Sequence, residues 1–508
     1  GGVSISVQSE PAEGFCYEMR QLDAELYMHT GTAEPVEMTT WMTMDENYVV
    51  TELTTASEHP IDVTVMTYAN GENKLYETTS GIREKVGQVS RRSRTEGDVR
   101  WIARAGISTR ITGTEASWEK TSSSQVTASF QIKAGQPVCI VTYVSGSLED
   151  DARLLEAYDK LSSVNGPQLA LLKIEKKQWW KDMWTRSYVE TNDSLLNRQY
   201  LSSIYLMASA CNLHSPVCGG MYGVWNMNDS MNYHGDIHLN YNSQAGFYSV
   251  FSANRPELAM PYYDFLEKLI PEGKRRAREE MGLVHPSLKD KSCRGLLFSV
   301  SALGNGYLYG EYWQQTMDAP FNVPLFSWYY EYTGDREFLR KRAYPFIREC
   351  GDFYEDYLEK ETLDSTYRYN ILTGGHEGSW DLNPPSDLAF VEQTFRLLLR
   401  YSEILGVDEN RRALWKDIVT HLPSYKVIMP TKTPNQGLPV YAKNEAGWDL
   451  PAHVIQLHPV YPCELLNLHS DSTALQLARN TLYYYAVDQQ GFTETMNELG
   501  LSAFVMGT

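Results

Sequence analysis

The chain has 508 residues, of which 42% are hydrophobic and 21% charged, as in an ordinary globular protein with room for two or three domains. Its formal net charge of −19 argues against the basic surfaces that nucleic acids and anionic membranes require, and no apolar run reaches the length of a membrane span. We therefore expect no nucleic-acid partner and no membrane insertion.

Residues 1–150 are predicted to form an N-terminal β-sandwich domain. Segments 47–57, 61–69, 123–134 and 137–147 carry β-branched residues in alternation and are bounded by Gly, Asn and Pro. Residues 151–194 are predicted to be a helical linker. There the pattern changes to a helical period, and a Gly166-Pro167 break is followed by a Trp-rich amphipathic stretch.

Residues 195–508 are predicted to form a helical domain. Helical periodicity recurs in segments 195–213, 256–270, 336–360, 387–405 and 472–487, with long loops rich in Gly, Asn, Pro and aromatic residues between them. Serial helices with elaborate loops indicate an α-solenoid or a closed α/α toroid. Long structured loops are disproportionately functional, so we look for the site in them.

One loop carries a row of polar side chains directly after a Trp-containing run that includes Trp225. Alternate positions from Asp236 hold hydrogen-bonding groups, and this spacing of two predicts one short extended segment with all of them on one face. The row is either a buried polar network or a surface for a neutral, polyhydroxylated ligand and its water. Its members are Asp236, His238, Asn240, Asn242 and Gln244.

Two further loops place a carboxyl group beside a tryptophan. Glu377 stands between His376 and a glycine, close to Trp380, which is typical of a general acid whose pKa an apolar wall raises. A surface glutamate in a turn is the alternative interpretation. Asp449 follows a tryptophan and precedes His453, and helix capping is its alternative.

Competitors near Asp449 are Glu445 and His458. No phosphate-binding Gly-rich loop, metal-type His pair or G-x-S-x-G elbow occurs, so we expect no cofactor and no metal. The seven cysteines are scattered without metal-ligand spacing, which favours free thiols.

Carboxylates, asparagines and aromatic loops over helices form the side-chain set for acid–base hydrolysis of a glycoside.

From about residue 170 onward the chain resembles the catalytic domain of glycoside hydrolase family 95. Three motifs carry the resemblance: a Gly-x-Trp-Asn element, a His-x-Asn-x-Asn-x-Gln row and an Asn-x-Pro-Glu helix start. They match Gly223, Trp225 and Asn226; His238, Asn240, Asn242 and Gln244; and Asn254, Pro256 and Glu257. The resemblance implies an N-terminal β-sandwich, a helical linker and an (α/α)6 toroid catalytic domain.

The resemblance also implies residue roles in an inverting hydrolysis of α-L-fucosides or α-L-galactosides. Glu377 resembles the general acid, Asn240 and Asn242 the pair that positions the water, and Asp449 the carboxylate that helps activate it. The polar and aromatic residues around them are predicted to bind substrate. These are Trp225, Asp236, His238, Gln244, His376, Trp380 and His453.

The chain departs from the family at two places. Gly-His-Glu-Gly surrounds Glu377 where the family has Ser-Pro-Glu-Asn, and Ile455 and Gln456 stand where it has a Ser-His pair. We therefore predict an inverting glycoside hydrolase acting on an oligosaccharide or polysaccharide, with two alternatives: an inactive glycan-binding protein on the same barrel and a related phosphorylase. The resemblance implies an extracytoplasmic, periplasmic or secreted location. The oligomeric state stays open.

Overall fold

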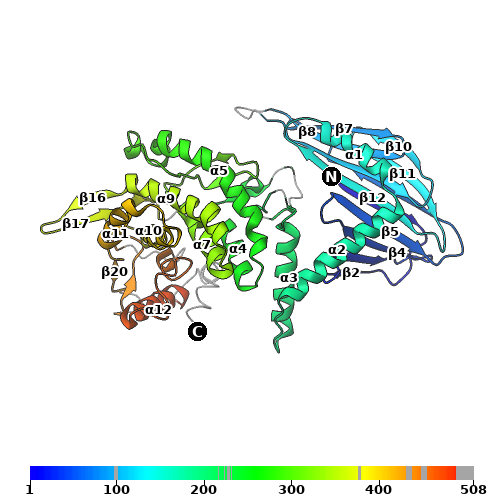
Figure 1. Ribbon diagram of the computed structural model, residues 1–508. Coiled ribbons are helices and arrows are strands. Elements are labelled where there is room, and N and C mark those ends of the chain that lie inside the picture. The colour runs from blue at the N-terminus through cyan, green and yellow to red at the C-terminus, as the bar shows by residue number, and fades with distance from the viewer. Residues whose placement is uncertain are drawn as a thin grey trace. The chain divides into compact units, whose positions relative to one another are not determined.

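A computed structural model of the chain describes residues 1–95, 101–215, 217–221, 223–225, 229, 231–375, 379–430, 437–447 and 455–487 (Figure 1). The chain divides into two compact units, Gly1–Tyr205 and Leu206–Thr508. None of the described helices combines the length and the apolar character that a membrane span requires.

The first unit is built on two antiparallel sheets. Within the described residues, the smaller sheet has the strand order β1-β6-β11-β10 and the larger has the order β2-β3-β4-β5-β12-β9-β8-β7. The strands are β1 (Gly2–Gln8), β2 (Cys16–Arg20), β3 (Glu25–His29), β4 (Val36–Met42), β5 (Tyr48–Thr55), β6 (Ile61–Tyr68), β7 (Tyr76–Arg83), β8 (Val86–Ser93), β9 (Arg104–Thr112), β10 (Ser117–Ser122), β11 (Gln125–Ile132) and β12 (Val138–Ser147).

Alternation along the strands explains how the two sheets pack. In β6, the residues Ile61, Val63 and Val65 are buried, while the residues between them are exposed or half-buried. Val65 lies opposite Ile5 of β1 and Ala128 of β11 in the register of the smaller sheet. One apolar face per strand therefore meets the same face of the other sheet, as in a β-sandwich.

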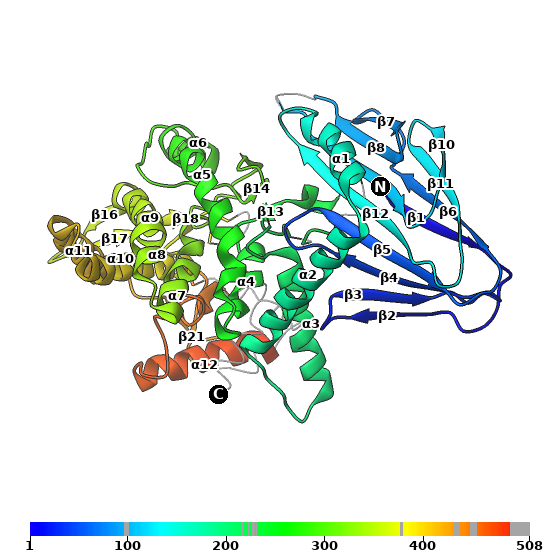
Figure 2. The same ribbon diagram turned by 45° about the vertical axis from the view of Figure 1, so that its right-hand side comes forward.

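Helices cover the other face of the larger sheet. They are α1 (Ala152–Ser163) and α2 (Gly166–Arg186), and α3 (Ser194–Ala210) follows them (Figure 2). Leu161 of α1 and Leu169 of α2 share a core cluster with Trp41 of β4. The predicted break at Gly166 and Pro167 begins α2, where the Asn165 side chain accepts a hydrogen bond from the Gln168 N–H.

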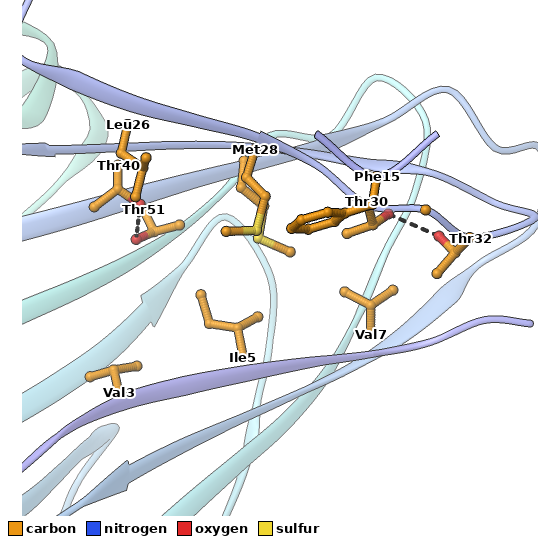
Figure 3. A pocket seen from close by; sticks show the side chains of 12 residues that line it. Val3, Ile5, Val7, Phe15, Leu26, Met28, Thr30, Thr32, Thr40 and Thr51 are labelled. Carbon is orange, nitrogen blue, oxygen red and sulfur yellow. Dashed lines mark hydrogen bonds between the residues drawn. The ribbon is translucent and has the colours of Figure 1, made fainter. Parts of the chain in front are cut away.

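An apolar cavity of about 450 Å³ lies between β1 and the β2–β5 end of the larger sheet. Figure 3 shows Val3, Ile5 and Val7 on one side, and Met28 and Phe15 on the other. Its lining contains no carboxyl group, amide or cation. This cavity therefore offers no acid or base for hydrolysis, and we look for the candidate site in the second unit.

The second unit is mainly helical. Its longer helices are α4 (Asn242–Ser252), α5 (Met260–Glu279), α7 (Val323–Thr333), α9 (Tyr344–Tyr357), α10 (Pro385–Leu405), α11 (Arg412–His421) and α12 (Ser472–Val487). Its shorter helical elements are η1 (Asn232–Gly235), η2 (Pro256–Ala259), α6 (Met281–Val284), η3 (Pro286–Leu288), η4 (Pro320–Asn322), α8 (Arg336–Phe338), η5 (Leu339–Ala343), η6 (Glu409–Arg411) and η7 (Ile455–Leu457).

Short strand pairs lie in the loops between these helices. They are β13 (Ile237–His238), β14 (Ser301–Ala302) and β15 (Leu308–Tyr309); β16 (Glu359–Thr362) and β17 (Tyr367–Asn370); β18 (Leu372–Thr373) and β19 (Asp381–Leu382); and β20 (Val427–Ile428) and β21 (Val440–Tyr441). Successive helices pack on one another, α4 against α7, α7 against α9, and α10 against α9 and α11.

Local sequence signals explain several helix ends. Gly334 ends α7 with φ +69°, and the Asp335 side chain then accepts hydrogen bonds from the Glu337 and Phe338 N–H groups to begin α8. The predicted helix at 472–487 has the same bounds as α12. All seven cysteines are free, as predicted, and five of them are buried.

Candidate active site

The first half of the predicted polar row is buried and paired. Asp236 is 1% exposed, and its Oδ2 accepts a hydrogen bond from the Tyr309 hydroxyl at 3.2 Å. The same oxygen lies 3.3 Å from Nδ1 of His238, and that imidazole packs 5.6 Å from the Trp313 ring. Asp236 and His238 therefore form a polar pair fixed by the β13–β14–β15 sheet.

The second half of the row corrects the prediction of one extended segment. Only Ile237 and His238 are in a strand, and Asn242 is the first residue of α4. Between the two asparagines, Tyr241 has φ +130° and ψ −51°, a conformation that non-glycine residues rarely adopt. The chain therefore turns sharply at Tyr241, and Asn240 and Asn242 lie on either side of that turn.

Gln244 holds this turn in place. Its Oε1 accepts a hydrogen bond from the Tyr241 N–H at 3.2 Å, and its Nε2 donates to the carbonyl of Leu239. The side chain is fully buried. Both ends of the Gln244 amide are therefore hydrogen-bonded to the backbone around Asn240. The contact of Gln244 with a sugar stays a prediction.

Contacts connect the asparagine turn to the loop that precedes Glu377. Asn240 Nδ2 donates to Oε1 of Gln315 at 3.4 Å. The adjacent Gln314 carbonyl accepts a hydrogen bond from the Gly374 N–H at 2.6 Å. A Cβ added at Gly374 would lie 2.7 Å from the carbonyl oxygen of Trp313, so only glycine fits this close approach.

A second set of contacts connects that loop to the one that precedes Asp449. Asn444 Nδ2 donates to Oδ1 of Asp381 at 2.7 Å, and the Glu445 N–H donates to the Leu382 carbonyl at 3.0 Å. The contacts of Asn240 with Gln315, of Gly374 with Gln314 and of Asn444 with Asp381 therefore link segments that are far apart in the sequence. His376, Glu377, Asp449 and His453 themselves lie outside the described residues.

Glu445, the competitor for the role of Asp449, is occupied by other partners. Its Oε1 accepts a hydrogen bond from Arg368 at 2.8 Å, and Asn383 donates to its Oε2. Both carboxylate oxygens of Glu445 therefore contact other side chains of the protein, and Asp449 stays the predicted base-side carboxylate.

The two predicted tryptophans differ in their surroundings. Trp225 is 49% exposed, and its ring lies against Gly223, where an added Cβ would be 2.3 Å from the ring. Trp380 stacks on the imidazole of His285, with ring centroids 4.1 Å apart and planes at 6°. His285 therefore covers one face of the Trp380 ring, and the sugar contact of this tryptophan stays a prediction.

Two polar residues near these loops were not predicted, and a third was noted only as a departure from the family pattern. Gln315 orients Asn240, and Asp387 is a fully buried carboxyl at the start of α10. Burial raises the pKa of Asp387 to about 7. Gln456, the noted departure, is fully buried, and neither of its amide atoms has a hydrogen-bond partner among the described residues. Of the two unpredicted residues, only Asp387 gave a signal in the sequence, as the first residue of the predicted 387–405 helix.

Within the described part of the chain, no group of three or more His, Cys, Asp or Glu side chains is arranged to hold a metal ion. The polar groups of the site are amides, hydroxyls and an imidazole paired with a carboxylate. Such neutral donors and acceptors suit sugar hydroxyls and water better than phosphate or a cation.

Comparison with known proteins identifies relatives of the chain. The glycosyl hydrolase family 95 catalytic domain matches residues 155–500. α-L-Fucosidase 2 of Arabidopsis thaliana is 26% identical over 239 residues, which cover 44% of this chain and 27% of that protein. The chain therefore spans about a quarter of the length of the curated relative that it matches.

A solved structure with the same architecture is more distant in sequence. A protein from the human microbiome named as a kojibiose phosphorylase gives a TM-score of 0.59 at 13% identity, covering 82% of this chain and 59% of that one. This match confirms the predicted fold class, a sheet domain followed by a helical domain of the (α/α)6 type. A bacterial glucoamylase in complex with acarbose gives a TM-score of 0.47 at 8% identity, covering 87% of this chain and 64% of that one.

Proposed function

The chain belongs to glycosyl hydrolase family 95, and on that premise we propose that it hydrolyses the bond to a terminal α-linked sugar. α-L-Fucosides and α-L-galactosides of plant or host glycans are the favoured substrates. One observation supports this most: hydrogen bonds join Asn240 to Gln315, Gly374 to the adjacent Gln314, and Asn444 to Asp381. Of these residues, Gly374 and Asp381 flank Glu377 and Asn444 closely precedes Asp449 in the sequence, as the proposed roles require.

In the proposed reaction, Glu377 protonates the leaving oxygen while a water attacks the anomeric carbon from the opposite face. Asn240 and Asn242 hold that water and Asp449 accepts its proton, so the configuration inverts. An inverting site needs about 6.5–9.5 Å between its two carboxyl groups to leave room for the water. General acid–base assistance of this kind contributes roughly 10²–10⁴-fold to the rate.

The strained turn supports the role of the asparagines. Backbone strain of the kind seen at Tyr241 costs about 1–3 kcal/mol and persists where the surroundings over-determine it. Gln244 provides that support from within the protein core. A fixed turn holds two amide groups ready for a water without ordering them during the reaction, which is the advantage of preorganisation.

The sugar specificity is proposed from the surroundings of the loops. His285 stacks on one face of the Trp380 ring, and we assign the other face to the sugar because pyranose C–H groups stack on aromatic faces. Gln456 occupies the place where the family carries a Ser-His pair, and its buried amide lacks a partner among the described residues. An unpaired buried amide is costly, so we propose that a sugar hydroxyl supplies the partner. The extracytoplasmic location stays a prediction.

The test is hydrolysis of a panel of aryl glycosides and of fucosylated and galactosylated oligosaccharides. We expect release of one monosaccharide by the wild-type chain, loss of release in Glu377→Gln, and retained release in the matched control Glu445→Gln. Proton NMR of the first product should show the β anomer from an α-linked substrate. Turnover that survives Glu377→Gln would refute the role of the general acid, and an α product would refute inversion.

A phosphorylase is the second candidate, because Lys443 is a cation that is 1% exposed in the segment before Asp449. A phosphorylase replaces the attacking water by phosphate, which needs cationic or hydroxyl donors beside the base. The same panel is therefore run with and without inorganic phosphate. Formation of a sugar 1-phosphate would favour this candidate. Sugar binding without turnover in either condition would favour the inactive glycan-binding alternative.

A further inference from the structure

Asp387 is a buried carboxyl group in the second unit that the proposed reaction does not use. It is the third residue of α10, and its side chain is fully buried. Oδ2 accepts a hydrogen bond from the Ser386 hydroxyl at 2.7 Å, and Thr373 of β18 also hydrogen-bonds this carboxyl. Oδ1 has no hydrogen-bond partner among the described residues.

The carboxyl lies against the residues that lead into Glu377. A Cβ added at Gly375 would lie 3.5 Å from Oδ2 of Asp387 and 2.4 Å from Cβ of Pro384. On the other side, Gly374 is held by the hydrogen bond from its N–H to Gln314. The two glycines are therefore clamped between the 313–314 backbone and the start of α10, two residues before Glu377.

Thr373 extends this clamp into the core. Its hydroxyl lies 3.0 Å from the Thr316 hydroxyl and also accepts a hydrogen bond from the Thr316 N–H at 3.3 Å. Thr316 and Gln315 are neighbours in the chain, and Gln315 contacts Asn240. Asp387 is thus connected through a few hydrogen bonds to both the acid loop and the asparagine turn.

The charged and titratable groups around Asp387 come from two other elements. Asp381 of β19 interacts with it electrostatically and raises its pKa. Tyr354 and Tyr357 of α9 also face it, and its charge raises the pKa of both hydroxyls. None of these three groups is cationic. Burial without a cationic partner raises the pKa of Asp387 to about 7, near the pH at which an acid catalyst works.

We propose that Asp387 is a positioning residue that fixes the Gly374–Gly375 backbone, from which the chain continues to the general acid. The inference rests on the proposed role of Glu377. A capping carboxylate at a helix start would explain the position in α10, but it does not explain the contacts with Thr373 and Gly375.

The test compares Asp387→Asn with the wild type in the full chain. Thr394→Val is the matched control, because Thr394 is a buried polar residue of the same helix whose hydroxyl donates a hydrogen bond to the Phe390 carbonyl. We expect Asp387→Asn to fold and to lose about tenfold or more in kcat with little change in KM, because a misplaced acid impairs the chemical step more than substrate binding. Thr394→Val should change neither.

A second readout does not depend on turnover. Asp387→Asn should accelerate hydrogen exchange in the peptide spanning residues 371–380, whereas Thr394→Val should leave that peptide unchanged. An unchanged kcat with unchanged exchange would overturn the inference. If Glu377→Gln abolishes turnover while Asp387→Asn leaves kcat and exchange unchanged, this inference alone fails. If Glu377→Gln retains full turnover, the proposed function fails. Faster hydrogen exchange in Asp387→Asn would then support only the packing of Gly374 and Gly375 against the start of α10.

Discussion

Substitution of Asp387 by asparagine should change how the stability of the protein depends on pH. The folded pKa of about 7 lies above the value of 3.8 for a free aspartate. Between these two pH values the folded state binds a proton that the unfolded state has lost. Stability is therefore greatest below about pH 4, falls as pH rises toward 7, and is level above it.

The size of this change follows from the two pKa values. A difference of about three pKa units corresponds to about 4 kcal/mol of unfolding free energy. Asparagine cannot ionise, so the fall in unfolding free energy between pH 4 and pH 7 that Asp387 causes is absent in Asp387→Asn. Its NH₂ group would take the place of Oδ1, which has no partner among the described residues, and an unsatisfied donor costs about 1–3 kcal/mol at every pH.

The assay is urea unfolding of the wild type and Asp387→Asn from pH 4 to pH 8. We expect the variant to be the less stable protein at pH 4 and the more stable one at pH 8. The difference between the two should move by about 4 kcal/mol in favour of the variant across this range. Other titrating groups are common to both proteins and cancel. Parallel pH dependences would refute the assignment of a raised pKa to this carboxyl.

Four further results are expected. Gly351→Ala should destabilise the fold by about 1–3 kcal/mol, because the new Cβ would lie 2.4 Å from Cδ1 of Leu398, and thermal unfolding should show partial rescue by Leu398→Ala. Gln244→Leu should lower kcat more than it changes KM, since it frees the turn at Tyr241; an unchanged kcat would contradict this. Gln456→Leu should raise the melting temperature while raising KM, and an unchanged KM would exclude sugar contact. Mass spectrometry of the native protein treated with a thiol reagent should find Cys16 modified and the buried cysteines protected, because Cys16 is exposed and burial raises the pKa of thiols such as Cys218 and Cys350.

Much of the architecture could be predicted from the sequence, because secondary structure depends on residues close together in the chain. Alternating β-branched residues predicted the strands of the sandwich, and helical periodicity predicted α12 with its observed bounds. The break at Gly166 and Pro167 marked the start of α2. The sequence motifs likewise predicted the family, which the match over residues 155–500 confirms.

The tertiary structure decided which side chains in the loops of the candidate site hold the backbone in place. The catalytic roles of the others stay predictions. The spacing of two predicted an extended polar row, but Gln244 bonds the backbone on both sides of Asn240 and stabilises a turn at Tyr241. Glu445 and Asp449 were competitors in the sequence until Arg368 was found paired with Glu445. The acidity of Asp387 depends on burial against Thr373 and Gly375. Such partners and the burial around them come from distant parts of the chain, so they cannot be predicted from the local sequence.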